Sequence, residues 1–317
     1  MFTKKTLKKV TAVSAALVLA FGAAACNRDS GDSGSGGGDN SVTLALSTRT
    51  NPFFVQLQEG AQKKADELGI KLNIQDASDD AAKQNDQLNN AATTGSKVVI
   101  VNPTDSDAVV AAVQALNNAN IPVVAVDRSA SGGTVDSFIA SDNVAGGKQA
   151  ADALAQSIGD EGEVLVLQGI AGSSASRDRG KGFTDGIATH PNVRVVGQQT
   201  ANFDRTEGLN VTTNLLQAHP DVKAIFAEND EMALGAIEAL GERAGRDIKV
   251  IGFDGTEDGL KAVTDGKMAA TIGQQPAKLG AQAVEQASKL LKKEQAQSEI
   301  HVEVVTVTQE NVKDFGK

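Results

Sequence analysis

The chain has no tryptophan, no tyrosine, 1 cysteine and only 3 histidines among its 317 residues. A single cysteine excludes a disulfide within the chain, so the folded part must be stabilised by a hydrophobic core. The histidines lie far apart, and His190 and His219 each precede a proline in an apparent turn, so no spacing typical of a metal site is present. We therefore expect neither a metal ion nor a cofactor.

Basic residues are also few: 30 Lys and Arg against 40 Asp and Glu give a formal net charge of −10. The charge becomes −14 when Lys4, Lys5, Lys8 and Lys9 are removed with the first 25 residues, because that segment contains no acid. Proteins that bind nucleic acids present basic surfaces, so this acidic composition argues against nucleic acid as a partner.

The first 25 residues predict a secretory signal, because four lysines precede an apolar run from Val10 to Ala25 that ends in small residues. The run is too short to span a bilayer comfortably, so we expect no permanent transmembrane helix. Its end, FGAAAC, places Cys26 after three alanines and resembles the lipobox of bacterial lipoproteins, although Ala23 stands where those proteins usually have Leu. The resemblance implies lipidation of Cys26, and cleavage to a free secreted form is the alternative.

The segment after the cysteine, NRDSGDSGSGGGDN (27–40), has no apolar residue to bury. Its Gly, Ser and Asp content is typical of a flexible tether, so we interpret residues 26–40 as a lipidated cysteine followed by a Gly/Ser linker. The remaining residues, 41–317, are sufficient for two domains of ordinary size.

Short apolar runs alternate with longer amphipathic segments along this remainder. The runs predicted as strands are 42–47, 98–102, 121–127, 138–142, 164–168, 224–230, 250–254 and 270–275. Helical patterns lie between them, such as VQLQEGAQKKADELG (55–69) and DAVVAAVQALNNAN (107–120), and several end at Gly or Asn as helices prefer. The alternation predicts an α/β fold with parallel sheets covered on both faces. One sheet of eight strands would satisfy the pattern, but the repeated units favour two similar lobes.

Nearly every predicted strand is followed by a hydrogen-bonding side chain. These are Ser47, Asn102, Asp127 with Arg128, Asp142 with Asn143, Gln168, Asn229 with Asp230, Asp254, and Gln274 with Gln275. Ligands of open α/β sheets bind at this carboxyl edge of the strands. Helix capping or turn formation is a sufficient interpretation for Asp105, Asp142, Asn143 and Asp230. It explains Gln274 and Arg128 poorly, since neither Gln nor Arg is a preferred cap.

The chemistry of these side chains suits a small ligand covered in hydroxyl groups. Carboxylates, amides and guanidinium groups are planar, multidentate partners for hydroxyls, and the C–H faces of a sugar pack against aromatic rings. Phe54, Phe203 and Phe253 stand beside polar candidates in NPFF, NFDR and GFDG. The alternative for Phe53 and Phe54 is a place in the core where a strand turns into a helix.

On these residues the sequence resembles the periplasmic ribose-binding proteins, the soluble receptors of ABC sugar importers. Shared stretches in order include NPFF, NPTDSDAV, IASDN, LQGIAG, GLNV, HPDV, NDEMALGA and GFDGT, and they cover essentially all of the chain after residue 41. The resemblance implies ligand contacts at Ser47, Asn51, Phe53, Phe54, Asn102, Asp127, Arg128, Arg179, Phe203, Asn229, Phe253, Asp254 and Gln274. It implies that Phe54, Phe203 and Phe253 sandwich the sugar ring, while Phe53 serves packing as much as contact. None of these positions is substituted, which favours ribose over another pentose or a hexose.

The resemblance also implies the architecture and the partners. Two Rossmann-like lobes of the periplasmic binding protein type I would be joined by crossovers near 140–142, 274–276 and 302–305. One lobe would be 41–141 plus 275–303, and the other 142–274 plus 304–317. The expected protein is a monomer that is exported, lipid-anchored to the outer face of the cytoplasmic membrane and in contact with the membrane only through that anchor. It would close over D-ribose by hinge bending and deliver it to the permease of an ABC importer.

Enzymes and transcription repressors that share such folds are the alternatives. The Gly-rich stretch GIAGSSASRDRG (169–180) follows a strand, but it lacks both the P-loop pattern and G-x-G-x-x-G. Asp127 with Asp254 is a weak acid-base pair, because neighbouring arginines and hydroxyl ligands explain both carboxylates. An export signal stands where a repressor would carry its helix-turn-helix. We therefore predict a non-enzymatic receptor with no catalytic residue, and keep a receptor for allose, xylose or galactose, or a sugar-modifying enzyme, as alternatives.

Overall fold

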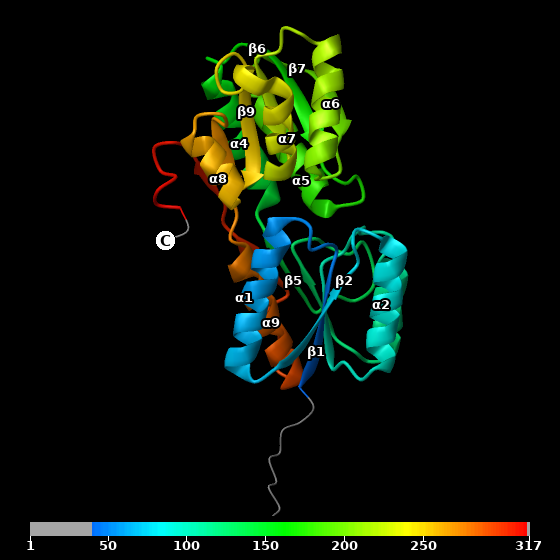
Figure 1. Cartoon of the computed structure of the whole chain (residues 1–317). Helices are drawn as coiled ribbons and strands as arrows, with labels where there is room; N and C mark the ends of the chain where they lie inside the picture. The colour runs from blue at the N-terminus through cyan, green and yellow to red at the C-terminus, as the bar shows by residue number, and fades with distance from the viewer. Residues whose placement is uncertain (1–39, 316–317) are drawn as a thin grey trace, which may run out of the picture. The chain divides into compact units, whose positions relative to one another are not determined.

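The computed structural model describes residues 40–315. The predicted signal, Cys26 and the linker as far as residue 39 lie outside the described residues. No helix within 40–315 combines the length and the hydrophobicity needed to cross a membrane. The described part contains two six-stranded sheets, each with helices on both faces, and we call them with their helices lobe 1 and lobe 2 (Figure 1).

Lobe 1 is a fully parallel sheet with the strand order β11-β5-β4-β3-β1-β2. Its strands are β1 (Ser41–Leu46), β2 (Lys71–Asp76), β3 (Val98–Val101), β4 (Val123–Val126), β5 (Ser137–Ser141) and β11 (Glu299–Val302). Helices α1 (Pro52–Leu68) and α9 (Pro276–Leu291) pack together on one face, and α2 (Ala81–Thr93) and α3 (Val110–Asn118) cover the other (Figure 1).

Lobe 2 repeats this arrangement with the order β12-β10-β9-β8-β6-β7. Its strands are β6 (Gly162–Gln168), β7 (Val193–Thr200), β8 (Ala224–Ala227), β9 (Lys249–Asp254), β10 (Ala270–Gly273) and β12 (Val305–Val307), of which only β12 is antiparallel to its neighbour. Helices α4 (Asn143–Ser157) and α5 (Ser174–Ile187) lie on one face. Helices α6 (Arg205–Ala218), α7 (Asp230–Leu240) and α8 (Glu257–Thr264) lie on the other, and a 3-10 turn (Gly241–Arg243) follows α7.

The inner strands are apolar on both faces because helices cover both faces of each sheet. In β3, Val98 and Ile100 pack toward α1 and α9, whereas Val99 and Val101 pack toward α2 and α3. This is the two-residue alternation of a strand buried on both sides. The prediction of two parallel-sheet lobes is confirmed, and the single eight-stranded sheet is not formed.

The chain passes between the sheets three times, at short segments. It leaves lobe 1 after β5 to enter α4, returns through 274–275 between β10 and α9, and crosses again through 303–304 between β11 and β12. Both sheets therefore present the carboxyl ends of their parallel strands close to these connections.

The helix starts revise two of the capping assignments. Asp142 caps α4 as expected, since its Oδ1 accepts a hydrogen bond from Ala145 N at 3.0 Å. The prediction that Asn143 and Asp230 are caps is wrong. Asn143 Oδ1 accepts from Arg179, and the cap of α7 is Asn229, whose Oδ1 accepts from Met232 N at 2.9 Å. Asp105 is a turn residue as predicted, with Oδ1 accepting from two following backbone N–H groups.

Candidate functional site

The thirteen predicted ligand residues lie in two layers, and all but Arg179, which is on α5, lie at the carboxyl end of a strand or in the segment that follows it. Nine of them line one small cavity together with Ala175: Asn51, Phe53, Phe54, Asp127, Arg128, Arg179, Phe203, Asn229 and Asp254. The other four, Ser47, Asn102, Phe253 and Gln274, are buried behind this lining. The second layer contacts the first, and its contacts identify what each member does.

In lobe 1 the charged pair follows β4 directly. Arg128 Nε lies 3.6 Å from Asp127 Oδ2, and both side chains are buried. Asn102, after β3, donates from Nδ2 to Asp127 Oδ2 at 3.3 Å, and its own Oδ1 accepts from the Ser47 hydroxyl at 2.7 Å. Ser47 and Asn102 therefore position Asp127 from behind the cavity.

The Arg128 side chain makes one hydrogen bond within the described residues, a 3.3 Å bond from NH1 to Pro103 O. Arg128 Nε and Asp127 Oδ1 are buried without a hydrogen-bond partner in the described residues. Buried polar atoms of this kind cost free energy when they stay unpaired, so this half of the site has unused capacity for a polar ligand.

In lobe 2 the arginine comes from a helix and its partners from several elements. Arg179, on α5, donates from Nε to Asn143 Oδ1 at 2.9 Å and from NH1 to the main-chain oxygen of Glu228 at 2.7 Å. Arg179 NH1 also lies 3.6 Å from Asp254 Oδ1 at the end of β9. Asn143 is thus a site residue that sequence reasoning missed, because a polar residue at a helix start reads first as a cap.

Asp254 is held by the neighbouring strand connection. Gln274, just after β10, donates from Nε2 to Asp254 Oδ1 at 2.6 Å, and the main-chain N–H of Gln274 donates to Asp254 O at 2.8 Å. Gln274 Oε1 has no hydrogen-bond partner among the described residues. Gln274 is therefore a support for Asp254, placed one layer from the cavity.

The four phenylalanines occupy different layers. Phe54 and Phe203 line the cavity, and the guanidinium carbon of Arg128 lies 5.2 and 5.5 Å from their ring centroids. Phe253 is fully buried, and its ring covers the Arg179 guanidinium at 3.9 Å. Phe53 packs edge-on against Phe54 with centroids 5.1 Å apart. Both phenylalanines at the start of α1 belong to the lobe 1 core and also line the cavity, so the two interpretations of NPFF coexist.

Three residues of the cavity wall have positive φ angles, a backbone conformation that residues other than glycine rarely adopt. Asp127 has φ 66°, Phe203 has φ 61° and Asp254 has φ 122°. Such conformations cost roughly 1–3 kcal/mol each and persist where surrounding contacts enforce them. Their concentration at the cavity is a signal of function that no sequence pattern contains.

Burial dominates the electrostatics of the site. It raises the pKa of Asp127, against the opposing effect of Arg128, and raises the pKa of Asp254 well above its ordinary value, against the effect of Arg179. Burial also lowers the pKa of the Arg128 guanidinium. The two arginines and two carboxylates balance, so the cavity combines charged hydrogen-bonding groups with no formal net charge.

The cavity is narrow, at about 20 Å³, which is close to the space of a single water molecule. The lobes touch beside it: Ser129 N donates to Ser174 Oγ at 2.9 Å, and Ser106 N donates to Gly172 O at 2.9 Å. A sugar therefore reaches these groups only when the walls move apart.

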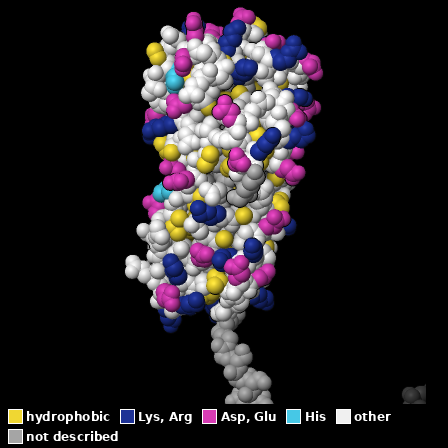
Figure 2. All heavy atoms as spheres, turned by 90° about the vertical axis from the view of Figure 1, so that its left-hand side faces the viewer, with side chains coloured by type: hydrophobic (Ala, Val, Ile, Leu, Met, Phe, Trp, Pro, Cys, Tyr) yellow, Lys and Arg dark blue, Asp and Glu magenta, His cyan; other side chains and the backbone are white. Residues whose placement is uncertain are grey.

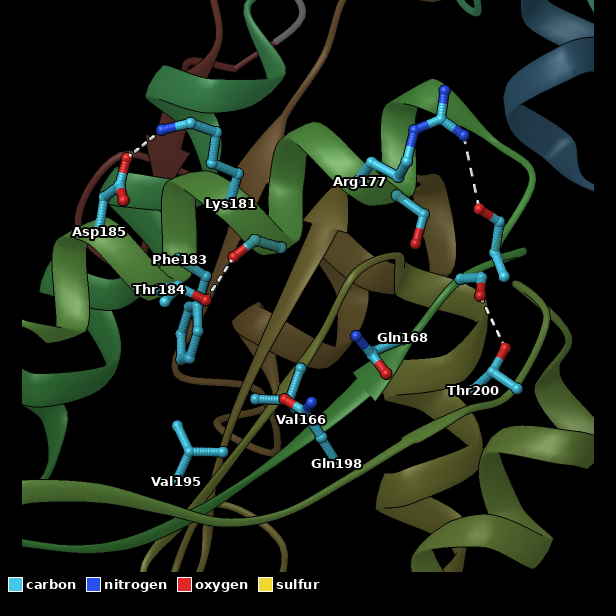
Figure 3. Close-up of a pocket in the computed structure, with 14 residues that line it drawn as sticks. Val166, Gln168, Arg177, Lys181, Phe183, Thr184, Asp185, Val195, Gln198 and Thr200 are labelled. Carbon is cyan, nitrogen blue, oxygen red and sulfur yellow. Dashed lines mark hydrogen bonds and ion pairs between the residues drawn. The ribbon is translucent and has the colours of Figure 1, made fainter. Parts of the chain in front are cut away.

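A larger hollow of about 540 Å³ lies within lobe 2, between α5 and the edge strand β7 (Figure 3). None of the thirteen predicted residues lines it. Its charged groups are exposed: Lys181 pairs with Asp185 along α5, and Arg177 points away toward Ala171 O. The buried Ser176 hydroxyl at its wall already donates to Glu228, so among the described residues this hollow lacks the converging buried polar groups of a specific site. Figure 2 likewise shows acidic and basic side chains interspersed over one face of the molecule, without a continuous basic patch.

Comparison with known proteins assigns the family. The periplasmic binding protein domain matches residues 42–295. The ribose import binding protein of Haemophilus influenzae is 48% identical over 303 residues, which cover 96% of this chain and 100% of that protein. The protein of the same name from Bacillus subtilis is 42% identical over 84% of this chain and 87% of its own length.

Solved structures agree with this assignment. The myo-inositol binding protein of Caulobacter, bound to myo-inositol, superposes with a TM-score of 0.84 at 35% identity, covering 88% of this chain and 97% of that one. An ABC transporter solute binding protein from Actinobacillus succinogenes with bound D-allose gives a TM-score of 0.81 at 32% identity, covering 87% and 99%. The chain belongs to the periplasmic binding protein domain family and falls among its sugar-binding receptors.

Proposed function

We propose that this protein binds D-ribose outside the cytoplasm and delivers it to the permease of an ABC importer. The observation that carries the proposal is the convergence of Asp127 with Arg128 from lobe 1, and Arg179 with Asp254 from lobe 2, on one cavity walled by Phe54 and Phe203. Charged, planar hydrogen-bonding groups beside aromatic rings match a compact ring that carries several hydroxyls. The names of the Haemophilus and Bacillus relatives support ribose as the sugar.

Binding would be accompanied by hinge movement. We assign residues 41–141 plus 275–303 to one lobe and 142–274 plus 304–317 to the other, with the hinge at the three crossings. The open form admits the sugar, and contacts made by both lobes to the sugar favour the closed form, which is the differential affinity that such a population shift requires. The thirteen predicted residues serve as the ligand set in two layers, nine facing the sugar and four supporting them.

The receptor would act without turnover, as a monomer held at the outer face of the cytoplasmic membrane by lipidated Cys26. Family membership supports binding and delivery, and no acid-base pair free of arginine partners faces the cavity among the described residues. Replacing Cys26 by Ser should release the protein from membranes and leave ribose affinity unchanged, because the tether separates anchor and site. A Cys26→Ser protein that stays on membranes after a salt wash contradicts the anchor.

Calorimetric titration of residues 41–317 with ribose, allose, xylose, galactose and glucose tests the ligand. Allose is included because the solute binding protein from Actinobacillus succinogenes has D-allose bound. We expect ribose to bind most tightly and ribose 5-phosphate at least about 100-fold more weakly, because its added negative charge has no free cation in a charge-balanced cavity. Tighter binding of another sugar, equal affinity for the phosphate, or chemical conversion of any sugar overturns the proposal.

A further inference from the structure

The C-terminal segment of the described chain folds back onto lobe 2 after β12. Thr308 N donates to Asn311 Oδ1 at 2.8 Å, Asn311 Nδ2 donates to Thr306 O at 3.0 Å, and Val312 N donates to Thr308 O at 2.9 Å. Val312 packs against the core between the sheet and helices α6, α7 and α8. These bonds bring Phe315, the last described residue, to a defined place.

The ring of Phe315 lies against two glycines. A methyl group added at Gly273 would overlap the ring, and one added at Gly255 would come within 2.8 Å of Phe315 Cε1. Gly255 also has φ 72°, a left-handed conformation that other residues adopt at a cost. The ring thus occupies space that only the absence of both side chains provides.

Both glycines are direct neighbours of site residues. Gly255 follows Asp254, Gly273 precedes Gln274, and Gly273 is the register partner of Asp254 between β10 and β9. The same corner contains the 2.6 Å bond from Gln274 Nε2 to Asp254 Oδ1 and the 2.8 Å bond from Gln274 N to Asp254 O. Phe315 therefore packs on the back of the corner whose front presents Asp254 to the cavity.

This corner also connects the two lobes, because the chain leaves lobe 2 through 274–275 to begin α9. Asp254 is strained there at φ 122°, and a strained residue keeps its position only while its surroundings enforce it. The Phe315 ring is packed on the two glycines that flank this corner, where it is placed to oppose such a relaxation of the backbone.

We propose that Phe315 is a positioning residue for the sugar site, which holds the Asp254–Gln274 corner in its binding geometry from outside the cavity. The inference rests on the proposed function, since it concerns the same site. Phe315 does not line the cavity, and it packs on the glycines beside Asp254 and Gln274, so we expect its effect on affinity to be transmitted by the backbone of this corner.

The first test compares Phe315→Ala with Val312→Ala, a control in the same segment that packs away from the corner. Both changes remove partly buried apolar groups and should lower the melting temperature without ligand. Only Phe315→Ala should weaken ribose binding, by about tenfold, because small displacements of a polar site residue are costly. Phe315→Leu, which keeps bulk, should retain most of the affinity. Equal affinities of the Phe315→Ala and Val312→Ala proteins overturn the inference.

The second test uses Gly273→Ala, which displaces the ring while leaving Phe315 in the sequence. Alone it should weaken ribose binding at least as much as Phe315→Ala. Combined with Phe315→Ala it should add little, because the methyl then fills space that the ring has left; Val307 Cγ2 at 3.0 Å is the remaining close neighbour. Fully additive losses would show that the glycine and the ring act separately, against the inference.

A readout without sugar separates this inference from the proposed function. Hydrogen exchange at the amides of Gly255 and Gln274 should accelerate in the Phe315→Ala protein and stay unchanged in the Val312→Ala protein. If the parent protein binds none of the sugars, the proposed function fails, while faster exchange confined to this corner still supports the positioning role. If exchange at the corner is unchanged in Phe315→Ala, the positioning role fails even when the parent protein binds ribose.

Discussion

The arginine and carboxylate of lobe 1 are consecutive residues at one strand end, whereas those of lobe 2 come from α5 and β9, far apart in the sequence. The sheets behind them have equivalent strand orders. Yet Arg179 donates hydrogen bonds from both Nε and NH1 and has the Phe253 ring at 3.9 Å. Arg128 has more distant rings, one long hydrogen bond and an Nε without a hydrogen-bond partner in the described residues.

The difference indicates that the two arginines have different roles in one site. Arg179 is fixed before any ligand arrives, so it loses little freedom on binding. Arg128 keeps a hydrogen-bond donor available, and Asp127 keeps its Oδ1 available as an acceptor. A ligand with several hydroxyls would complete the hydrogen bonding of lobe 1 and meet a preformed wall in lobe 2.

The largest expected effect comes from replacing each arginine by lysine, which keeps the charge but loses the planar fork. Arg179→Lys should weaken ribose binding more than about 100-fold and lower the melting temperature without ligand by several degrees. It leaves Asn143 Oδ1 and Glu228 O without their donor. Arg128→Lys should weaken binding by at least about tenfold with a smaller stability loss. Calorimetric titration and thermal melting measure both quantities.

Arg177→Lys is the matched control on the same helix, because Arg177 is exposed and its side-chain hydrogen bond in the part of the chain that the structure describes is a 3.5 Å bond to Ala171 O. It should change neither affinity nor melting temperature. Equal stability losses in the Arg128→Lys and Arg179→Lys proteins would abolish the distinction between an adaptable and a preformed half of the site.

A smaller effect is expected at the two phenylalanines of α1. Phe54→Leu keeps apolar bulk but loses the flat ring near the cavity, and should weaken ribose binding by roughly tenfold, about 1.4 kcal/mol. Phe53→Leu should cost less affinity, because the contact of its ring is with Phe54. Both variants should melt within a few degrees of the parent, as conservative core changes do. Unchanged ribose affinity in Phe54→Leu would assign both rings to the core alone.

The smallest effect on binding is expected at Glu228, whose main-chain oxygen accepts from Arg179 and whose side chain makes its hydrogen bonds within lobe 2. Gly169 N donates to Glu228 Oε2 at 2.7 Å, and the Ser176 hydroxyl donates to the same oxygen, while Oε1 has no partner in the described residues. Burial raises the pKa of Glu228 from 4.5 to about 7. The folded state therefore holds a proton at a higher pH than the unfolded chain does, so this group contributes stability at low pH that is lost as the pH rises from 4.5 toward 7.

Glu228→Gln should remove this loss of stability. The free energy of unfolding of the variant should therefore rise relative to that of the parent by up to about 3 kcal/mol between pH 4 and pH 8. The Gln oxygen can accept both existing hydrogen bonds, and ribose affinity should change less than about threefold. Urea unfolding across this pH range measures the difference, with the exposed Glu238 on α7, replaced by Gln, as control. Parallel pH profiles of Glu228→Gln and parent would contradict a buried, proton-binding Glu228.

The sequence predicted the inner strands and missed the edges. All eight apolar runs correspond to inner strands, whereas β2, β7, β11 and β12 were not recognised, and they are the four edge strands of the two sheets. An edge strand is covered on fewer sides and needs fewer apolar residues: β2 reads KLNIQD with two exposed positions, and β7 reads VRVVGQQT with five. Only the folded sheet identifies such segments as strands, since their pairing is set by a neighbour distant in sequence.

The residues at the site were predictable, but their layers were not. The resemblance to the family predicted which residues form the site. The position of most of them after strand ends explains why they lie close together. The support of Arg179 by Asn143 depends on an approach between α4 and α5 that has no local pattern. The positive φ angles of Asp127 and Asp254 are likewise set by the fold, because neither residue type requires them.

The three crossings between lobes have a consequence for the order in which the chain can fold. Lobe 1 begins with β1 but receives α9 and β11 only from residues 276–302, and lobe 2 receives its last strand at 305–307. Synthesis proceeds from the N-terminus. A chain synthesised only as far as residue 273 would leave β5 and β10 as sheet edges without β11 and β12, and would leave the α9 side of the lobe 1 core open to water. Neither lobe can complete its sheet during early synthesis, so both reach their final form together, within the last few residues of the described chain.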